Sequence, residues 1–77
     1  MKQVKVLGSG CANCQRTYSL LEEIARAKGE AIELEKVEDM PRIMSYGIMS
    51  TPGVVIDGKV VHAGGVPERK TAESWFD

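Results

Sequence analysis

GSGCANCQRTYSLLEE, residues 8–23, contains both cysteines of the chain, Cys11 and Cys14. Glycines precede the pair and a helical pattern follows it, which places the two thiols at the start of a helix. Two thiols at this spacing can form a redox-active pair, ligate a metal or form a structural staple. A disulfide across two intervening residues closes so short a loop that it restricts the unfolded chain little, so the staple is the weakest of the three interpretations.

Composition and charge narrow the class of protein. The chain has 77 residues, enough for one domain, and 43% of them are hydrophobic, as in ordinary globular proteins. Ten basic residues against eleven acidic ones leave a formal net charge of -1, which argues against a general nucleic-acid binder. No apolar run approaches the roughly 20 residues of a membrane span, and Lys5 interrupts the apolar start of the chain. We therefore expect a single domain over residues 1–77, cytoplasmic, with no membrane or nucleic-acid partner.

The position of the thiols favours redox chemistry. A thiol attacks a disulfide only as its thiolate. Free backbone N–H groups and the positive end of the helix dipole stabilise that anion, and a CxxC motif so placed commonly brings the first thiol to a pKa of about 3.5–7.5. No acidic residue precedes Glu22, while several basic residues do. We expect Cys11 to be the exposed nucleophile and Cys14 to be the buried thiol that resolves the mixed disulfide.

The rest of the chain alternates strand and helix patterns. Strands are predicted over residues 2–7, 31–37, 53–56 and 59–63. Helices are predicted over residues 12–28, over 40–46, and from Val66-Pro67 onward. Gly8 to Gly10 is expected to be a flexible connection, Asp39 an N-cap, and Asp57-Gly58 a two-residue hairpin turn. The order β-α-β-α-β-β-α predicts a small α/β domain whose first two strands are parallel, whose hairpin is antiparallel, and whose helices cover both faces of a mixed sheet.

A second feature is Thr51-Pro52, directly before the third predicted strand. Proline cannot donate to a strand ladder, so it belongs at a strand's first position or at a bend. In the cis form this peptide would expose the Thr51 backbone beside the thiols, where it could hydrogen-bond an incoming peptide as an added strand. The pattern of residues alone leaves cis and trans open.

These segments resemble the thioredoxin-like superfamily, and most closely its small "redox-active disulfide protein 2" or thioredoxin-3 branch of bacteria and archaea. The matching pieces cover nearly the whole chain in order: GSGCANCQ, EKVEDM, YGIMSTPGVVIDGKVV and the glycine-rich step into the last helix. The resemblance implies a minimal thioredoxin-like α/β fold, with a four-stranded mixed sheet flanked by three helices. It also implies that Pro52 is cis and packs against the cysteine pair.

The same resemblance implies a function and a site. The chain would be a thiol-disulfide oxidoreductase that exchanges disulfides with protein substrates. We further expect an unidentified reductase as electron donor, a monomer, and no bound cofactor beyond the Cys11–Cys14 disulfide. The residues expected to contact substrate are Gly10, Ala12, Asn13, Thr51 and Pro52. Ordinary thioredoxins also carry a buried acid on the strand before the motif that assists the second cysteine. Residues 1–10 contain no such acid, so resolution by Cys14 would be slow or would use another base.

The alternative function is a soft metal or metalloid carrier that uses the same two thiolates. Soft ions such as Cu(I) and Zn prefer thiolates, but a closed zinc site needs two more ligands, and His62 is the only histidine of the chain. Two chains could instead share four cysteines. We expect His62 to be a solvated edge-strand residue. Tyr18 and Trp75 are expected in or beside the core, and helix or loop packing is expected for Met40, Met44 and Met49.

Overall fold

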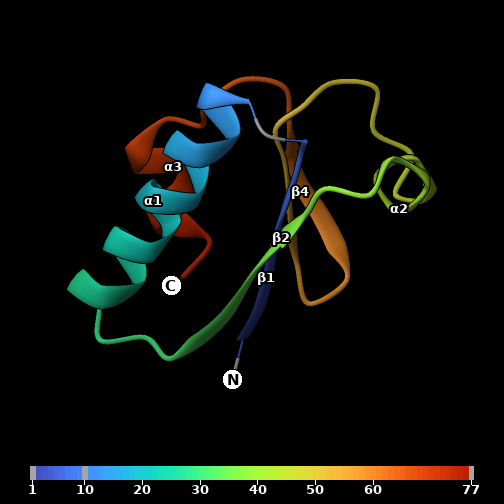
Figure 1. Ribbon diagram of the computed structural model, residues 1–77. Helices are drawn as coiled ribbons and strands as arrows, with labels where there is room; N and C mark the ends of the chain where they lie inside the picture. Colours follow the sequence, from blue (N-terminus) through green and yellow to red (C-terminus); the bar gives the residue numbers. More distant parts are fainter. Residues whose placement is uncertain (1, 10, 77) are drawn as a thin grey trace.

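The elements follow one another in the predicted order. The computed structural model describes residues 2–9 and 11–76. Its strands are β1 (Lys2–Leu7), β2 (Ile32–Val37), β3 (Gly53–Ile56) and β4 (Lys59–Ala63). Its helices are α1 (Ala12–Ala27), α2 (Met40–Ser45) and α3 (Arg69–Ser74) (Figure 1). In this part of the chain no helix is long and apolar enough to cross a membrane.

The four strands form one mixed sheet in the order β2-β1-β3-β4. β1 pairs parallel with β2 and antiparallel with β3, and β3 pairs antiparallel with β4. β3 is buried along its whole length because it is a central strand with both faces covered, which explains its unbroken run of apolar residues. β2 lies at an edge, and its half-buried Ile32 and Leu34 alternate with the exposed Glu33 and Glu35.

Helices cover both faces of this sheet, as predicted (Figure 1). α1 and α3 lie together on one face, and α2 lies on the other. The core under α1 and α3 consists of Val4, Val6, Leu21, Ile24, Ala25, Val54, Ile56, Ala72 and Phe76. The smaller core under α2 consists of Leu7, Val37, Ile43 and Val55. Neighbouring residues of β1 and β3 therefore contribute to opposite cores, as the two-residue period of a strand requires.

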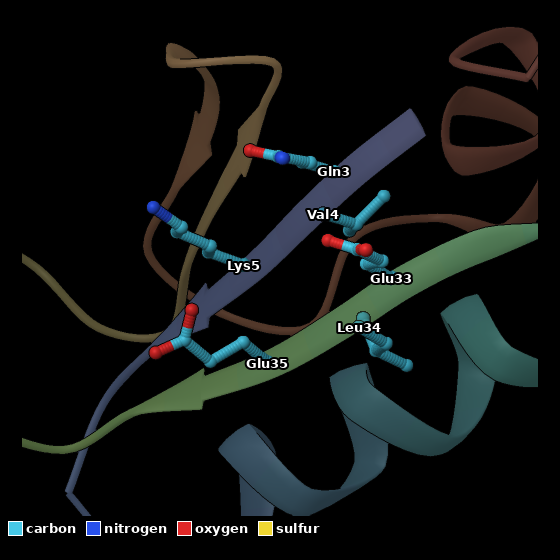
Figure 2. A pocket seen from close by; sticks show the side chains of 6 residues that line it. All are labelled: Gln3, Val4, Lys5, Glu33, Leu34 and Glu35. Carbon is cyan, nitrogen blue, oxygen red and sulfur yellow. The ribbon is translucent and has the colours of Figure 1, made fainter. Parts of the chain in front are cut away.

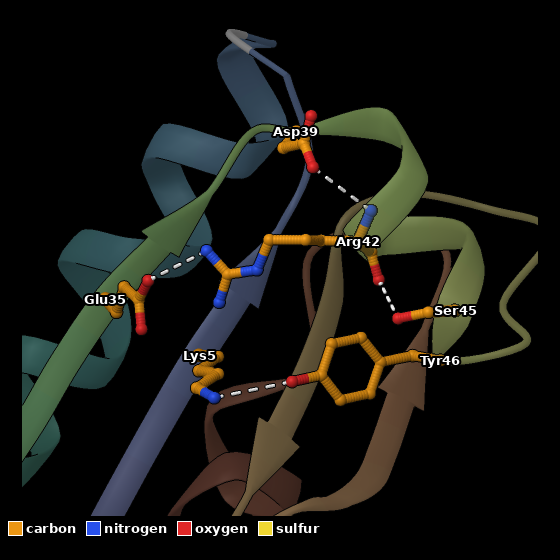
Figure 3. A network of polar contacts seen from close by, with 6 residues as sticks. All are labelled: Lys5, Glu35, Asp39, Arg42, Ser45 and Tyr46. Atoms are coloured by element: carbon orange, nitrogen blue, oxygen red, sulfur yellow. Dashed lines mark hydrogen bonds and ion pairs between the residues drawn. The ribbon is translucent and has the colours of Figure 1, made fainter.

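Polar contacts tie α2 to the sheet (Figure 3). The carboxylate of Asp39 caps the helix by accepting from the backbone N–H of Arg42 at 3.4 Å, as the sequence predicted. The side chain of Arg42 reaches Glu35 of β2 at 3.3 Å, and the ammonium group of Lys5 donates to the hydroxyl of Tyr46 at 3.4 Å. The short helix is thus held by polar contacts as well as by its buried Ile43.

The hairpin turn also forms where the sequence predicted it. Asp57 and Gly58 both have positive φ angles, 50° and 83°, which is the conformation that a two-residue hairpin loop requires. The side chain of Asp57 accepts from the backbone N–H of Gln3 at 3.0 Å, so the turn is fixed to β1 as well.

Two sequence predictions about these elements are wrong. α3 begins at Arg69 rather than at Val66-Pro67, because Glu68 keeps an extended backbone as the N-cap and the buried Pro67 belongs to the preceding segment. The methionines do not pack: Met40, Met44 and Met49 are 52%, 68% and 99% exposed. A helix of six residues has room to bury little more than one side chain, and α2 uses Ile43.

The aromatic residues lie closer to their predicted positions than the methionines do. Tyr18 and Trp75 are partly buried against the larger core, as predicted. His62 is less solvated than predicted. Its ring lies 6.0 Å from that of Trp75, and its Nε2 lies 2.9 Å from the carbonyl oxygen of Gly65. α3 is further tied to α1 by Arg69, whose guanidinium donates to Glu23 and Glu73, and these two carboxylates raise the pKa of Arg69.

Leu21→Ala is expected to lower the free energy of unfolding by about 2–5 kcal/mol, because Leu21 is completely buried between α1 and the sheet. So large a loss approaches the whole net stability of a domain of this size. Urea unfolding followed by circular dichroism measures it. Leu20→Ala is the matched control, since Leu20 is the neighbouring, partly exposed residue of the same helix. Equal losses from the two variants would contradict this description of the core.

Candidate active site

The two cysteines lie at the N-terminus of α1 and are joined by a disulfide, with their Cα atoms 5.1 Å apart. Cys11 is the N-cap residue, with an extended backbone, and its Sγ accepts a hydrogen bond from the backbone N–H of Cys14 at 3.0 Å. A serine or aspartate oxygen commonly takes this position at a helix start. No acidic residue lies in the first turn of α1 to oppose a negative charge on sulfur.

The two sulfur-bearing residues differ in their exposure. Cys11 is partly exposed, whereas Cys14 is only 6% exposed and belongs to the buried set of residues. One turn further along α1, the fully buried Thr17 donates its hydroxyl hydrogen to the carbonyl oxygen of Asn13 at 2.8 Å, which leaves no buried polar group unpaired there. The site therefore has one cysteine within reach of solvent and one behind it.

Gly8 makes the close packing around Cys14 possible, and sequence reasoning missed it. The residue is buried, and its N–H donates to the carbonyl oxygen of Val37 at 2.9 Å, so it is not the flexible connection that was expected. A Cβ atom on Gly8 would overlap the Sγ of Cys14 and would lie 3.5 Å from the Cβ of Thr51. Glycine is thus required because the backbone passes directly against the sulfur. The glycine shortly before the CxxC motif was the sequence signal from which this close contact could have been predicted.

Thr51 and Pro52 lie on the other side of this contact. The peptide bond between them is cis, as the resemblance implied. Pro52 is fully buried and its carbonyl oxygen accepts from the N–H of Gly64 at 2.9 Å, whereas Thr51 is exposed. Since a Cβ on Gly8 would meet both Cys14 and Thr51, the threonine and the buried cysteine lie side by side.

The remaining predicted contact residues are placed as follows. Ala12 and Asn13 lie between the cysteines in the first turn of α1, and both are exposed. Gly10 lies outside the residues that the structure describes. The structure thus brings Ala12, Asn13 and Thr51 to the same end of the sheet as the disulfide.

A small pocket of about 40 Å³ opens beside the buried cysteine. Its lining residues come from β1 and the residue after it, from α1, and from β2 and the residue after it: Val6, Gly8, Cys14, Gln15, Lys36 and Glu38. The sequence did not predict that the last two would lie near Cys14. They are the ionisable side chains that this pocket shares with the thiol.

Another hollow, of about 250 Å³, lies over the paired strands β1 and β2 (Figure 2). It is lined by Gln3, Val4, Lys5, Glu33, Leu34 and Glu35. The lining contains no thiol, hydroxyl or imidazole, and its charged groups are Lys5, Glu33 and Glu35. Within residues 2–9 and 11–76, no group of three or more His, Cys, Asp or Glu side chains is placed to hold a metal ion.

A disulfide at the N-terminus of the helix that crosses from β1 to β2, beside a cis-proline before β3, defines a thioredoxin-like thiol-disulfide oxidoreductase. The family model described as "Thioredoxin domain" matches residues 2–77, and the chain belongs to that family.

Known relatives agree with this assignment. A thioredoxin of Methanothermobacter thermautotrophicus is 31% identical over 70 residues, which is 91% of each chain. A thioredoxin of Methanocaldococcus jannaschii is 31% identical over 67 residues, which is 87% of this chain and 77% of the relative.

Solved structures share the fold. A chloroplastic thioredoxin z superposes with a TM-score of 0.74 over 99% of this chain and 75% of its own, at 15% identity. The oxidised thioredoxin of Plasmodium falciparum superposes with a TM-score of 0.67 over 99% of this chain and 82% of its own, also at 15% identity.

Gly8→Ala is expected to lower the free energy of unfolding of the oxidised protein by about 1–3 kcal/mol, as overpacking of a close contact does. The added methyl group has no space because the Cys14 sulfur occupies it. Urea unfolding measures the change. Ser9→Ala, at the exposed neighbouring position, is the control and should be close to neutral. If Gly8→Ala were as stable as the parent chain, the contact would not constrain the site.

Proposed function

We propose that this protein reduces disulfide bonds in other proteins through Cys11 and Cys14. The observation that carries the proposal is the unequal exposure of the two cysteines at one helix N-terminus: Cys11 is within reach of a substrate and Cys14 is buried behind it. The Cys11 thiolate attacks one sulfur of the substrate disulfide. This forms a mixed disulfide and releases the other substrate sulfur as a thiolate, which takes up a proton.

Cys14 then completes the exchange. Its thiolate attacks the Sγ of Cys11, the Cys11–Cys14 bond forms, and the bond between Cys11 and the substrate breaks. The substrate leaves as a second thiolate, and two electrons have passed from the dithiol to the substrate. The spacing suits this step, because Cys14 lies one turn behind Cys11 with its backbone N–H directed at the Cys11 sulfur.

The helix N-terminus supports the first step. In the reduced protein the hydrogen bond from the Cys14 N–H and the helix dipole favour the thiolate of Cys11 over its thiol. Cys14 lacks this advantage because burial disfavours a charged sulfur. The two thiols are therefore suited to different roles, nucleophile and resolving thiol.

Substrate contacts are assigned to the residues around Cys11. Ala12, Asn13 and Thr51 are exposed beside the disulfide, and Pro52 fixes the backbone of Thr51 from its buried position. An extended substrate segment can hydrogen-bond to the Thr51 backbone as an added strand. Gly10, which directly precedes Cys11, is included in the proposal on sequence grounds alone.

The proposal extends to the protein's working conditions. Electrons pass through the dithiol itself, so no bound cofactor is needed, and a separate reductase restores the reduced form. We assign the chain to the cytoplasm, the compartment in which thiols are kept reduced, as a single domain over residues 1–77 that acts as a monomer.

Cysteine variants test the two roles. Cys11→Ser is expected to lose disulfide reduction, because the accessible nucleophile is gone. Cys14→Ser is expected to carry out the first attack and stop at the mixed disulfide, which mass spectrometry detects as an adduct on Cys11. Continued turnover by Cys11→Ser would overturn the assignment.

A redox titration tests whether the pair cycles at all. On metal-free protein, glutathione or dithiothreitol buffers are expected to give one two-electron transition within the range of known dithiol proteins, roughly −120 to −270 mV. A value near the negative end fits a cytoplasmic reductase. A protein with no reversible disulfide would not be an oxidoreductase, and the soft-metal carrier would then be the function to test.

A further inference from the structure

The second half of the exchange needs a proton acceptor that the first strand does not supply. Cys14 is 6% exposed, and burial raises the pKa of a thiol, yet this thiol must lose its proton before it attacks Cys11. On the face of β1 that α1 and α3 cover, Val4 and Val6 are apolar core residues, and Lys2, at the other end of the strand, contacts Trp75 and Phe76. Lys5 lies on the opposite face, where its ammonium group contacts Tyr46 under α2. The acceptor must therefore come from another element.

The pocket beside Cys14 contains a candidate. Lys36 and Glu38 are its ionisable side chains besides the thiol. A cavity needs roughly 10–15 Å³ to hold one water molecule, and this pocket measures about 40 Å³, so water fits between the thiol and these charged groups.

The strand period explains how both residues reach the pocket. Ile32 and Leu34 of β2 pack against the core under α1, and alternate residues of a strand share one face. Lys36 continues this row, and its ammonium lies 4.9 Å from the centre of the Tyr18 ring on α1. Glu38 continues the row one step beyond the end of the strand.

Of the two charged groups, the carboxylate is the one that can take a proton. A lysine ammonium has three donors and no acceptor, and Lys36 is held at the Tyr18 ring. Among the described residues, the Glu38 carboxylate takes part in none of the ion pairs or side-chain hydrogen bonds, so it is not engaged elsewhere. Its exposure lets it pass the proton on to solvent.

We propose that Glu38 accepts the proton of Cys14 through a water molecule in this pocket, which makes it the base of the resolving step. This rests on the proposed function. The thiol proton passes to the water as the water gives a proton to the carboxylate, and the Cys14 thiolate then attacks the Sγ of Cys11. The Cys11–Cys14 bond forms, the substrate thiolate leaves, and Glu38 releases its proton to solvent. The ionisable groups around the thiol are thus Cys11 on α1 and the pocket-lining Lys36 and Glu38.

A two-phase reaction tests the proposal. The reduced protein is mixed with excess of the chromogenic aromatic disulfide DTNB, which releases one coloured thiolate when Cys11 attacks and a second when Cys14 resolves the mixed disulfide. Glu38→Gln is expected to leave the first phase unchanged. It should slow the second phase by about 100-fold at neutral pH, the lower end of what a positioned acid or base contributes, and move its rise to higher pH.

Whether the second phase becomes slower or faster in Glu38→Gln distinguishes a general base from a negative charge that only disfavours the thiolate. If Glu38 acted only as a negative charge near Cys14, its removal would favour the thiolate and make the second phase faster. A faster or unchanged second phase would therefore overturn the proposal. Glu38→Asp keeps a carboxylate one methylene shorter and should fall between Glu38→Gln and the parent chain.

Glu33→Gln is the matched control, since it makes the same change of charge on β2, the strand that Glu38 directly follows, at the hollow of Figure 2 rather than at the thiol pocket. It should leave both phases unchanged, and urea unfolding should show that neither variant alters stability. If the parent chain itself gave no second phase, the proposed function would fail; if only the dependence on Glu38 were missing, the oxidoreductase would stand without this base.

Discussion

The close approach between the Gly8 backbone and the Cys14 sulfur organises this small domain. It brings the end of β1 into contact with the first turn of α1, and Thr51 approaches the same point from the loop before β3. Three segments that are distant in the sequence therefore meet at the disulfide. Because no side chain fits between the Gly8 backbone and the Cys14 sulfur, the end of β1 and the first turn of α1 must keep this close spacing for the site to form.

The two hydrophobic cores hold the strands that carry these three segments. β1 and β3 each send alternate residues to the core under α1 and α3 and to the core under α2, so the central strands are held from both faces. A disulfide across so short a loop restricts the unfolded chain less than a wider cross-link does. The fold must therefore rely on its cores when the cysteines are reduced. A protein that cycles between a reduced and an oxidised form needs a fold whose stability does not depend on the disulfide.

Much of this could be predicted from the sequence, because the signals were local. The Asp57-Gly58 turn, the apolar run of β3 and the Asp39 cap each depend on a few adjacent residues, and each formed where expected. The glycine before the motif and the alternation along β2 were local signals, but the meeting of Gly8 and Glu38 with Cys14 depends on which segments lie together in space, and no local pattern encodes that. The exposure of Met40 and Met44 was missed for a different reason: their apolar character predicts burial, but a helix of six residues covers too little of the sheet to provide it. Met49 lies in the loop between α2 and β3.

The alternation along β2 has a consequence for how copies of the chain meet. β2 is an edge strand, and the edge of a sheet is a template on which a second strand can pair. If two copies paired antiparallel about Leu34, Glu33 of one would lie opposite Glu35 of the other; in a parallel pair in register, each glutamate would face itself. Like charges directly opposite one another destabilise a strand pair. In these two registers the glutamates therefore oppose the pairing of this edge with a second copy of the chain, a role for two carboxylates that is separate from the chemistry at the disulfide.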